Sequence, residues 1–149
     1  MKQMGMNKLW LMLALHFVSM FVLMYSMVDA PDEVLFNLNN VYMAALMTMP
    51  MLVLEMLMMG EMYGGAKVTR WLMVAGIAGL IAFFVFIRQQ TLIGDKEFLR
   101  SMIPHHSGAI LMCQRSSIED AQIKRLCGQI VESQRAEIAE MEEILRRLE

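Results

Sequence analysis

Residues 98–113 combine side chains that bind soft metals with a spacing that suits one helix. The stretch reads Phe-Leu-Arg-Ser-Met-Ile-Pro-His-His-Ser-Gly-Ala-Ile-Leu-Met-Cys and holds two of the three histidines of the chain. On a helix its donor groups form two adjacent lines, one through Met102, His105 and Met112, the other through Met102, His106 and Cys113. Imidazole, thioether and thiol groups suit Cu(I) and similar ions. The alternative interpretation is structural, because methionine and cysteine are also common core residues.

This stretch and residues 130–141 resemble the family called domain of unknown function 305. The pattern is Met-x-x-His-His-x-x-Ala-Ile-x-Met, and the resemblance covers residues 88–149. Five residues match the motif positions of the family: Met102, His105, His106, Met112 and Met141. The resemblance implies a membrane-attached form with three hydrophobic helices before the motif. Soluble relatives in this family are similar to ferritin-like helical bundles. Some of these relatives are implicated in copper or silver binding, so the resemblance implies such an ion here.

Composition divides the chain into two parts. The 149 residues are 57% hydrophobic, yet residues 88–149 carry 9 of the 13 basic and 10 of the 15 acidic side chains. We therefore expect a membrane domain at residues 1–88 and a polar helical domain at residues 89–149. The net charge of −2 gives no indication of a nucleic-acid partner. The predicted partner of the first part is the lipid bilayer.

Three apolar stretches predict transmembrane helices at about residues 9–28, 41–60 and 71–87, since each approaches the length that crosses a hydrocarbon core of ~30 Å. For the first, a cleaved signal peptide is the competing interpretation. Basic residues flank the N-terminus and the second loop, but the first loop has none; they are Lys2, Lys8, Lys67 and Arg70. The positive-inside rule then predicts a cytoplasmic N-terminus and an extracytoplasmic polar domain. We expect the cytoplasmic (inner) membrane of a bacterium.

The polar domain predicts two helices, from Asp95 to about Arg115 and from about Ala121 to Leu148. Asp95 is the expected N-cap of the first, and Ser117 or Asp120 that of the second. The second helix carries a near-heptad stripe of inward positions: Cys127, Val131, Gln134, Ile138, Met141, Leu145 and Leu148. The fold class expected for the whole chain is therefore all-α.

Folding these two helices into a hairpin brings together positions that are equally distant from the turn. This places Cys113 near Cys127, His106 near Gln134, and Met102 within a turn of Met141. Two helices of this size bury too little apolar surface to be stable alone. We therefore expect a second copy of the chain to complete a four-helix bundle, so the protein should be at least a homodimer.

The two cysteines have two functional interpretations, and a third possibility is that they are neighbouring buried thiols that do neither. Outside the cytoplasm, Cys113 and Cys127 could form a disulfide that joins the two helices of the hairpin. As thiolates, they could instead add two ligands to a Cu(I) site. The sequence does not decide between them.

Methionine is abundant in the membrane part, where 16 of the 19 methionines precede residue 88. Two helical stripes, Met12–Met27 and Met43–Met62, each include one ionisable residue, His16 and Glu55. With neighbours such as Met20 and Met51 these residues could form a second soft-metal site, because ionisable groups in a bilayer are often functional. Alternatively, methionine replaces leucine on packed faces, and Glu55 is protonated or hydrogen-bonded.

The expected function is a membrane-anchored Cu(I) or Ag(I) binder in metal homeostasis or resistance. The predicted ligands are Met102, His105, His106, Met112, Met141, Cys113 and Cys127. Catalysis is not expected, because neither motif histidine has the Glu-x-x-His spacing of a di-iron bundle and no nucleophile motif or phosphate loop is present. The alternative is a non-catalytic assembly module whose histidines and methionines are structural.

Overall fold

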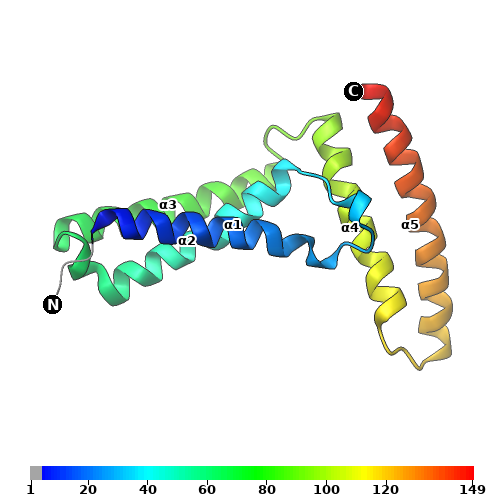
Figure 1. The fold of residues 1–149 in the computed structure, drawn as a ribbon, viewed down its shortest axis with the longest axis horizontal. Helices are drawn as coiled ribbons and strands as arrows, with labels where there is room; N and C mark the ends of the chain where they lie inside the picture. Colours follow the sequence, from blue (N-terminus) through cyan, green and yellow to red (C-terminus); the bar gives the residue numbers. More distant parts are fainter. Residues whose placement is uncertain (1–4) are drawn as a thin grey trace. The chain divides into compact units, whose positions relative to one another are not determined.

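A computed structural model of the protein describes residues 5–149 (Figure 1). Five α-helices are present, with no strand among these residues: α1 (Met6–Leu23), α2 (Leu38–Met59), α3 (Ala66–Gln89), α4 (Asp95–Arg115) and α5 (Ala121–Leu148). Three short 3-10 helices join them: η1 (Met24–Met27), η2 (Pro31–Glu33) and η3 (Gly60–Tyr63). The all-α prediction is confirmed. Lys2, one of the basic residues used for the topology, lies outside the described residues.

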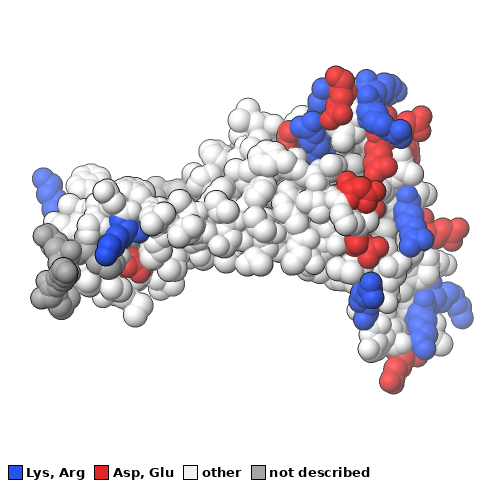
Figure 2. All heavy atoms as spheres, in the orientation of Figure 1, with Lys and Arg blue, Asp and Glu red and all other residues white. Residues whose placement is uncertain are grey.

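Three helical stretches are long and apolar enough to cross a membrane. They are Met6–Met27, Leu38–Tyr63 and Ala66–Gln89, with 22, 26 and 24 residues. Each one includes the apolar core of a predicted span, but the boundaries differ by several residues. The second and third begin earlier than expected, because a helix continues its backbone hydrogen bonds into flanking polar residues. Figure 2 shows the same division in charge: on the visible face, Lys, Arg, Asp and Glu gather over α4 and α5, and the middle of α1–α3 shows none.

The chain forms two compact units. The first, residues 1–23 and 39–91, contains α1, nearly all of α2, and α3. Its core is a cluster of Leu9, Leu13, Leu52, Met56 and Tyr63. The first helix is therefore an integral part of this core.

Two glycines allow α3 to approach α2 closely. A Cβ at Gly76 would lie 2.8 Å from Cγ2 of Val53, and one at Gly79 would lie 2.5 Å from the sulfur of Met49. Small residues that bring helix backbones together are common in membrane helices. Large side chains such as Trp10, Leu54 and Ile81 remain exposed on the outside of the unit. Such a surface suits the acyl chains of a bilayer.

The second unit comprises residues 24–38 and 92–149. It contains the α4–α5 hairpin and, unexpectedly, the connection between the first two membrane helices, which packs on α4. Composition predicts instead that this connection belongs to the membrane domain, residues 1–88. Only α2 and α3 separate these two segments in the chain, so one unit built from both is compatible with a membrane crossed by both helices.

The ends of α4 and α5 were predicted correctly, but one cap was not. Oδ1 of Asp120 accepts hydrogen bonds from the backbone N–H groups of Gln122 and Ile123, at 2.8 and 3.0 Å, so Asp120 is the N-cap of α5. Asp95, by contrast, is the first helical residue of α4, and the cap position belongs to Gly94, which has no side chain to bond. Asp95 and Glu97 instead place negative charge in the first turn, where the helix dipole favours it.

Candidate metal centre

The predicted ligands on α4 divide between two faces of the helix. His106 faces inward, with a side chain that is 13% exposed, and Met102, one turn before it, is half-buried. His105 is exposed, and so is Met112, at 52%. We call Met102, His106 and Cys113, which lie toward α5, the inner line. His105 and Met112, which are exposed, form the outer line.

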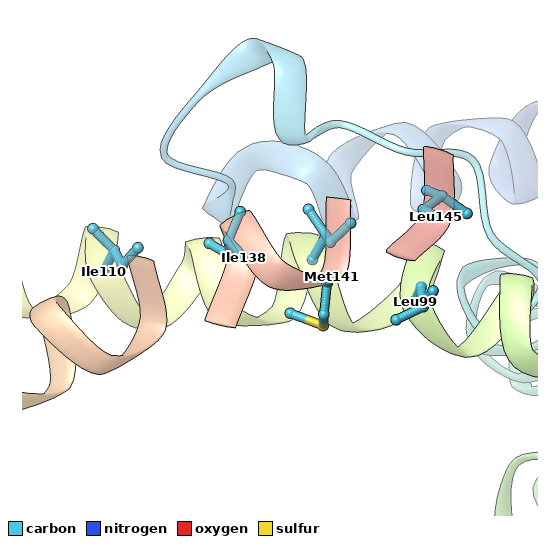
Figure 3. Packing of buried hydrophobic residues seen from close by; sticks show 6 residues of the cluster. Leu99, Ile110, Ile138, Met141 and Leu145 are labelled. Atoms are coloured by element: carbon cyan, nitrogen blue, oxygen red, sulfur yellow. The ribbon is translucent and has the colours of Figure 1, made fainter. Parts of the chain in front are cut away.

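Met102 lies at the edge of the buried core of the hairpin, which includes Met141. Met102 packs against the buried cluster of Leu99, Ile103, Ile110, Ile138, Met141 and Leu145. Figure 3 shows the side chain of Met141 extending toward α4 on the stretch that holds Leu99. The predicted inward stripe of α5 is confirmed: Ile138, Met141 and Leu145 are buried, and its other members are half-buried.

Glu137 is the acidic residue beside His106. Its Oε2 atom lies 3.0 Å from Nδ1 of His106, which is an ion-pair distance, although the angle does not meet hydrogen-bond geometry. The carboxylate also accepts hydrogen bonds from Ser133 Oγ to Oε1, at 2.6 Å, and from Gln134 Nε2 to Oε2, at 3.4 Å. The expected neighbour Gln134 thus reaches the histidine through Glu137. Glu137 lies one turn before the motif residue Met141, and this spacing is the sequence feature that could have identified Glu137 as part of the site.

This arrangement resembles the surroundings of many metal-bound histidines. Such histidines usually direct one ring nitrogen at a carboxylate, which fixes the ring and strengthens the other nitrogen as a ligand. In His106, Nδ1 faces Glu137, so Nε2 is the nitrogen that could bind an ion. Met102 lies one turn before His106 on α4, and Met141 lies one turn after Glu137 on α5.

Cys113 and Cys127 form a disulfide, with their Cα atoms 5.2 Å apart. The predicted proximity is therefore correct, and of the two functional interpretations the structure contains the disulfide. In this state neither sulfur is a thiolate, so neither can serve as the Cu(I) ligand that the alternative required. The disulfide lies near the turn of the hairpin and joins the two helices there.

Within residues 5–149, no three His, Cys, Asp or Glu side chains converge in a way that could hold a metal ion. Met102 and Met141 add thioether sulfurs to the hairpin, and neutral thioethers bind soft ions well and hard ions poorly.

Ser107 and Gly108, which follow the histidines, hold the connection of residues 24–38 against α4. The fully buried Ser107 hydroxyl accepts a hydrogen bond of 2.7 Å from the backbone N–H of Asp29. A Cβ at Gly108 would lie 3.3 Å from the carbonyl oxygen of Met27, so a larger residue would crowd this contact. Sequence reasoning missed both residues, since nothing local in the sequence indicates their partners.

Ion pairs connect the two helices at the end of the hairpin away from the turn. Oε2 of Glu97 accepts a hydrogen bond of 2.9 Å from the backbone N–H of Leu38, the first residue of α2. Arg100 pairs with Glu97 at 3.4 Å and with Glu149 at 3.0 Å. Hydrogen bonding to Glu149 raises the pKa of the Arg100 guanidinium above its ordinary value. The end of α5 is thereby tied to the start of α4.

In the predicted secondary membrane site, Glu55 has a hydrogen-bond partner. The hydroxyl of Tyr63 donates a hydrogen bond to Glu55, as the structural alternative proposed. His16, Met20 and Met51 are half-buried. The Met43–Met62 stripe does not coincide with the buried face of α2, which is formed by Tyr42, Ala44, Ala45, Thr48, Leu52 and Met56.

The chain belongs to a protein family whose description leaves its function open. Residues 88–145 match the family described as "Domain of unknown function (DUF305)", and the chain is a member of it. A similar protein is "Uncharacterized protein L153" of Acanthamoeba polyphaga mimivirus, which is 36% identical over 115 residues, or 76% of this chain and 74% of the viral protein. Because this matched stretch is longer than the whole chain after Ile87, it also includes part of the membrane helices. No solved structure matches the chain.

Proposed function

We propose that the protein is a membrane-anchored binder of a soft monovalent ion, Cu(I) or Ag(I), that acts in metal storage, buffering or delivery. The observation that supports this most directly is the position of His106 on the hairpin seam, one turn from Met102, which packs against the buried cluster that includes Met141. Those three side chains are the proposed ligands. The proposal includes no catalytic step.

The chemistry of the donors suits an oxidising compartment. Thioethers stay unprotonated and do not form disulfides, so they remain available where thiols are oxidised. The imidazole adds a stronger donor, for which protons compete with the ion. Glu137 would orient the ring of His106 during binding.

The same chemistry favours an extracytoplasmic position for the hairpin. The disulfide between Cys113 and Cys127 is typical of the periplasm or cell surface. Lys67 and Arg70 flank the loop between α2 and α3, which favours the cytoplasm for that loop. We therefore propose a cytoplasmic N-terminus, with the hairpin outside the inner membrane of a bacterium.

A second copy of the chain would cover apolar residues that the hairpin leaves exposed. Phe98, Met112, Ile123 and Leu126 are each about half exposed. A homodimer would bury them as the second half of a four-helix bundle. It would also bring the outer line, His105 and Met112, into an interface, where it could add ligands between chains.

The exposed apolar residues also support the second candidate function, a module that assembles with another membrane protein. In that case Met102 and His106 serve only to pack the hairpin, and Leu at the methionine positions should be tolerated. The ligand set therefore distinguishes the two functions.

The test is an anaerobic Cu(I) titration of the detergent-purified protein against a competing chelator. Met102→Leu/His106→Ala protein removes the inner line, and His105→Ala/Met112→Leu protein is the matched control on the outer line. We expect the inner variant to lose at least 100-fold in affinity and the outer variant to lose much less. Equal losses would indicate a site shared between two chains. No tight binding by any of the three proteins would contradict the metal function and leave the assembly module.

A further inference from the structure

A second group of methionines lines a cavity at the C-terminal end of α2. The cavity has a volume of about 530 Å³ and lies where α2, η3 and α3 meet. Five of its eleven lining residues are methionines, Met56, Met58, Met59, Met62 and Met73, whereas methionine makes up 19 of the 149 residues of the chain. The enrichment is therefore high even for this sequence.

These methionines come from three elements and differ in burial. Met56, in the core, is 2% exposed, Met59 and Met73 are half-buried, and Met58 is 82% exposed. Met56, Met59 and Met62 follow one another at three-residue spacing, so they lie along one side of the chain as α2 passes into η3. Met73 faces the same cavity from α3.

The turn between α2 and α3 fixes the walls of this cavity. The hydroxyl of Thr69, in the first turns of α3, donates a hydrogen bond of 2.8 Å to the carbonyl oxygen of Gly60. A Cβ at Gly60 would collide with the side chain of Thr69, so only glycine permits this approach. Gly64 and Gly65, with φ of +123° and +85°, form a turn that other residues adopt only with strain. The thioethers are thus carried by a constrained framework.

We propose that this cavity is a second binding site for a soft monovalent ion, Cu(I) or Ag(I). Neutral thioether sulfurs bind such ions, whereas they do not replace the water that Na⁺, Mg²⁺ or Ca²⁺ would lose. Two charged side chains also line the cavity, Glu61 and Arg70, and both are exposed. The ion would lie among the thioethers, and Glu61 could offset its charge.

This site uses no residue of the hairpin, so ion binding in the cavity can be tested separately from ion binding in the hairpin. Lys67 and Arg70, at the start of α3, favour the cytoplasmic side for this end of the helix by the positive-inside rule. With both sites present, the protein would bind the same class of ion on either side of the membrane.

The experiment uses full-length protein in lipid nanodiscs, with ¹³C-labelled methionine methyl groups, titrated with silver nitrate and observed by NMR. Met59→Leu/Met62→Leu changes the cavity with nearly the same side-chain volume. Met43→Leu/Met47→Leu is the matched control, because these residues lie elsewhere on α2 and are exposed. His106→Ala protein removes the hairpin site separately.

We expect the methyl signals of Met56, Met59, Met62 and Met73 to shift at silver concentrations at least tenfold lower than those of Met43 and Met47. The cavity variant should bind one silver ion fewer per chain, and the control variant the same number as the parent protein. The cavity shifts should persist in His106→Ala protein. Uniform shifts of all membrane methionines, or an unchanged silver stoichiometry in the cavity variant, would overturn the proposal.

Discussion

At the scale of single residues, the contact between His106 and Glu137 differs most from the sequence prediction. Counting equal distances from the turn placed His106 beside Gln134, three residues from the observed neighbour. Helical side chains lean toward the N-terminus of their own helix, so in an antiparallel pair His106 leans away from the turn while Glu137 leans toward it. The two therefore meet across an offset that counting Cα positions does not include. The predicted proximity of Met102 and Met141 already includes the same offset along the sequence.

Glu137→Gln should lower Cu(I) affinity by about 10- to 100-fold, because the carboxylate that orients a ligand histidine is replaced by a neutral amide. Chelator competition measures the change. Glu140→Gln is the control, since it removes the same charge from an exposed position on α5. Equal affinities for these two variants would show that Glu137 does not act on the ion.

At the scale of elements, local signals predicted the helices, and distant partners decided their surroundings. The bounds of α4 and α5 follow from their polar ends and from the inward stripe of α5, which the sequence displays directly. The packing of residues 24–38 on α4 could not be predicted in this way. It depends on a bond between Asp29 and Ser107, which are 78 residues apart, and periodicity within one helix does not report such a pair.

Ser107→Ala should destabilise the second unit by about 1–3 kcal/mol, because the N–H of Asp29 loses its acceptor in a partly buried position. Amide hydrogen exchange should rise across residues 24–38. Ser117→Ala, at an exposed position near the turn, is the control and should change neither quantity. Unchanged exchange in Ser107→Ala protein would mean that the hydroxyl does not hold this connection.

Removing the disulfide separates its structural role from ligation. Cys113→Ser/Cys127→Ser should cost roughly 3 kcal/mol of stability, the value expected for opening a loop of about 15 residues, and thermal unfolding measures this. Cu(I) affinity should stay within a few-fold of the parent protein, because the sulfurs are bonded to each other. A tenfold or greater loss of affinity would identify the cysteines as ligands.

At the scale of the whole molecule, composition alone predicted the division into apolar and polar parts. It did not predict that residues 24–38 would join the hairpin unit, and that grouping supports three crossings independently of charge. The extracytoplasmic side proposed for this unit rests on the basic residues and the disulfide.

Membrane-impermeant maleimide can test that orientation, because both native cysteines are in the disulfide. In intact cells, Ser117→Cys should be labelled, whereas Lys67→Cys should be labelled only after the membrane is permeabilised. Both positions are exposed, so access differs only by side. The reverse pattern would place the hairpin in the cytoplasm.

The most direct test of the metal function is X-ray absorption spectroscopy of protein loaded with one equivalent of Cu(I). Met59→Leu/Met62→Leu protein is the parent, so that the hairpin is the site observed. We predict a first shell of both nitrogen and sulfur, with the nitrogen lost in His106→Ala and sulfur lost in Met102→Leu/Met141→Leu. A first shell that is unchanged by either substitution would contradict the assignment of these residues as ligands.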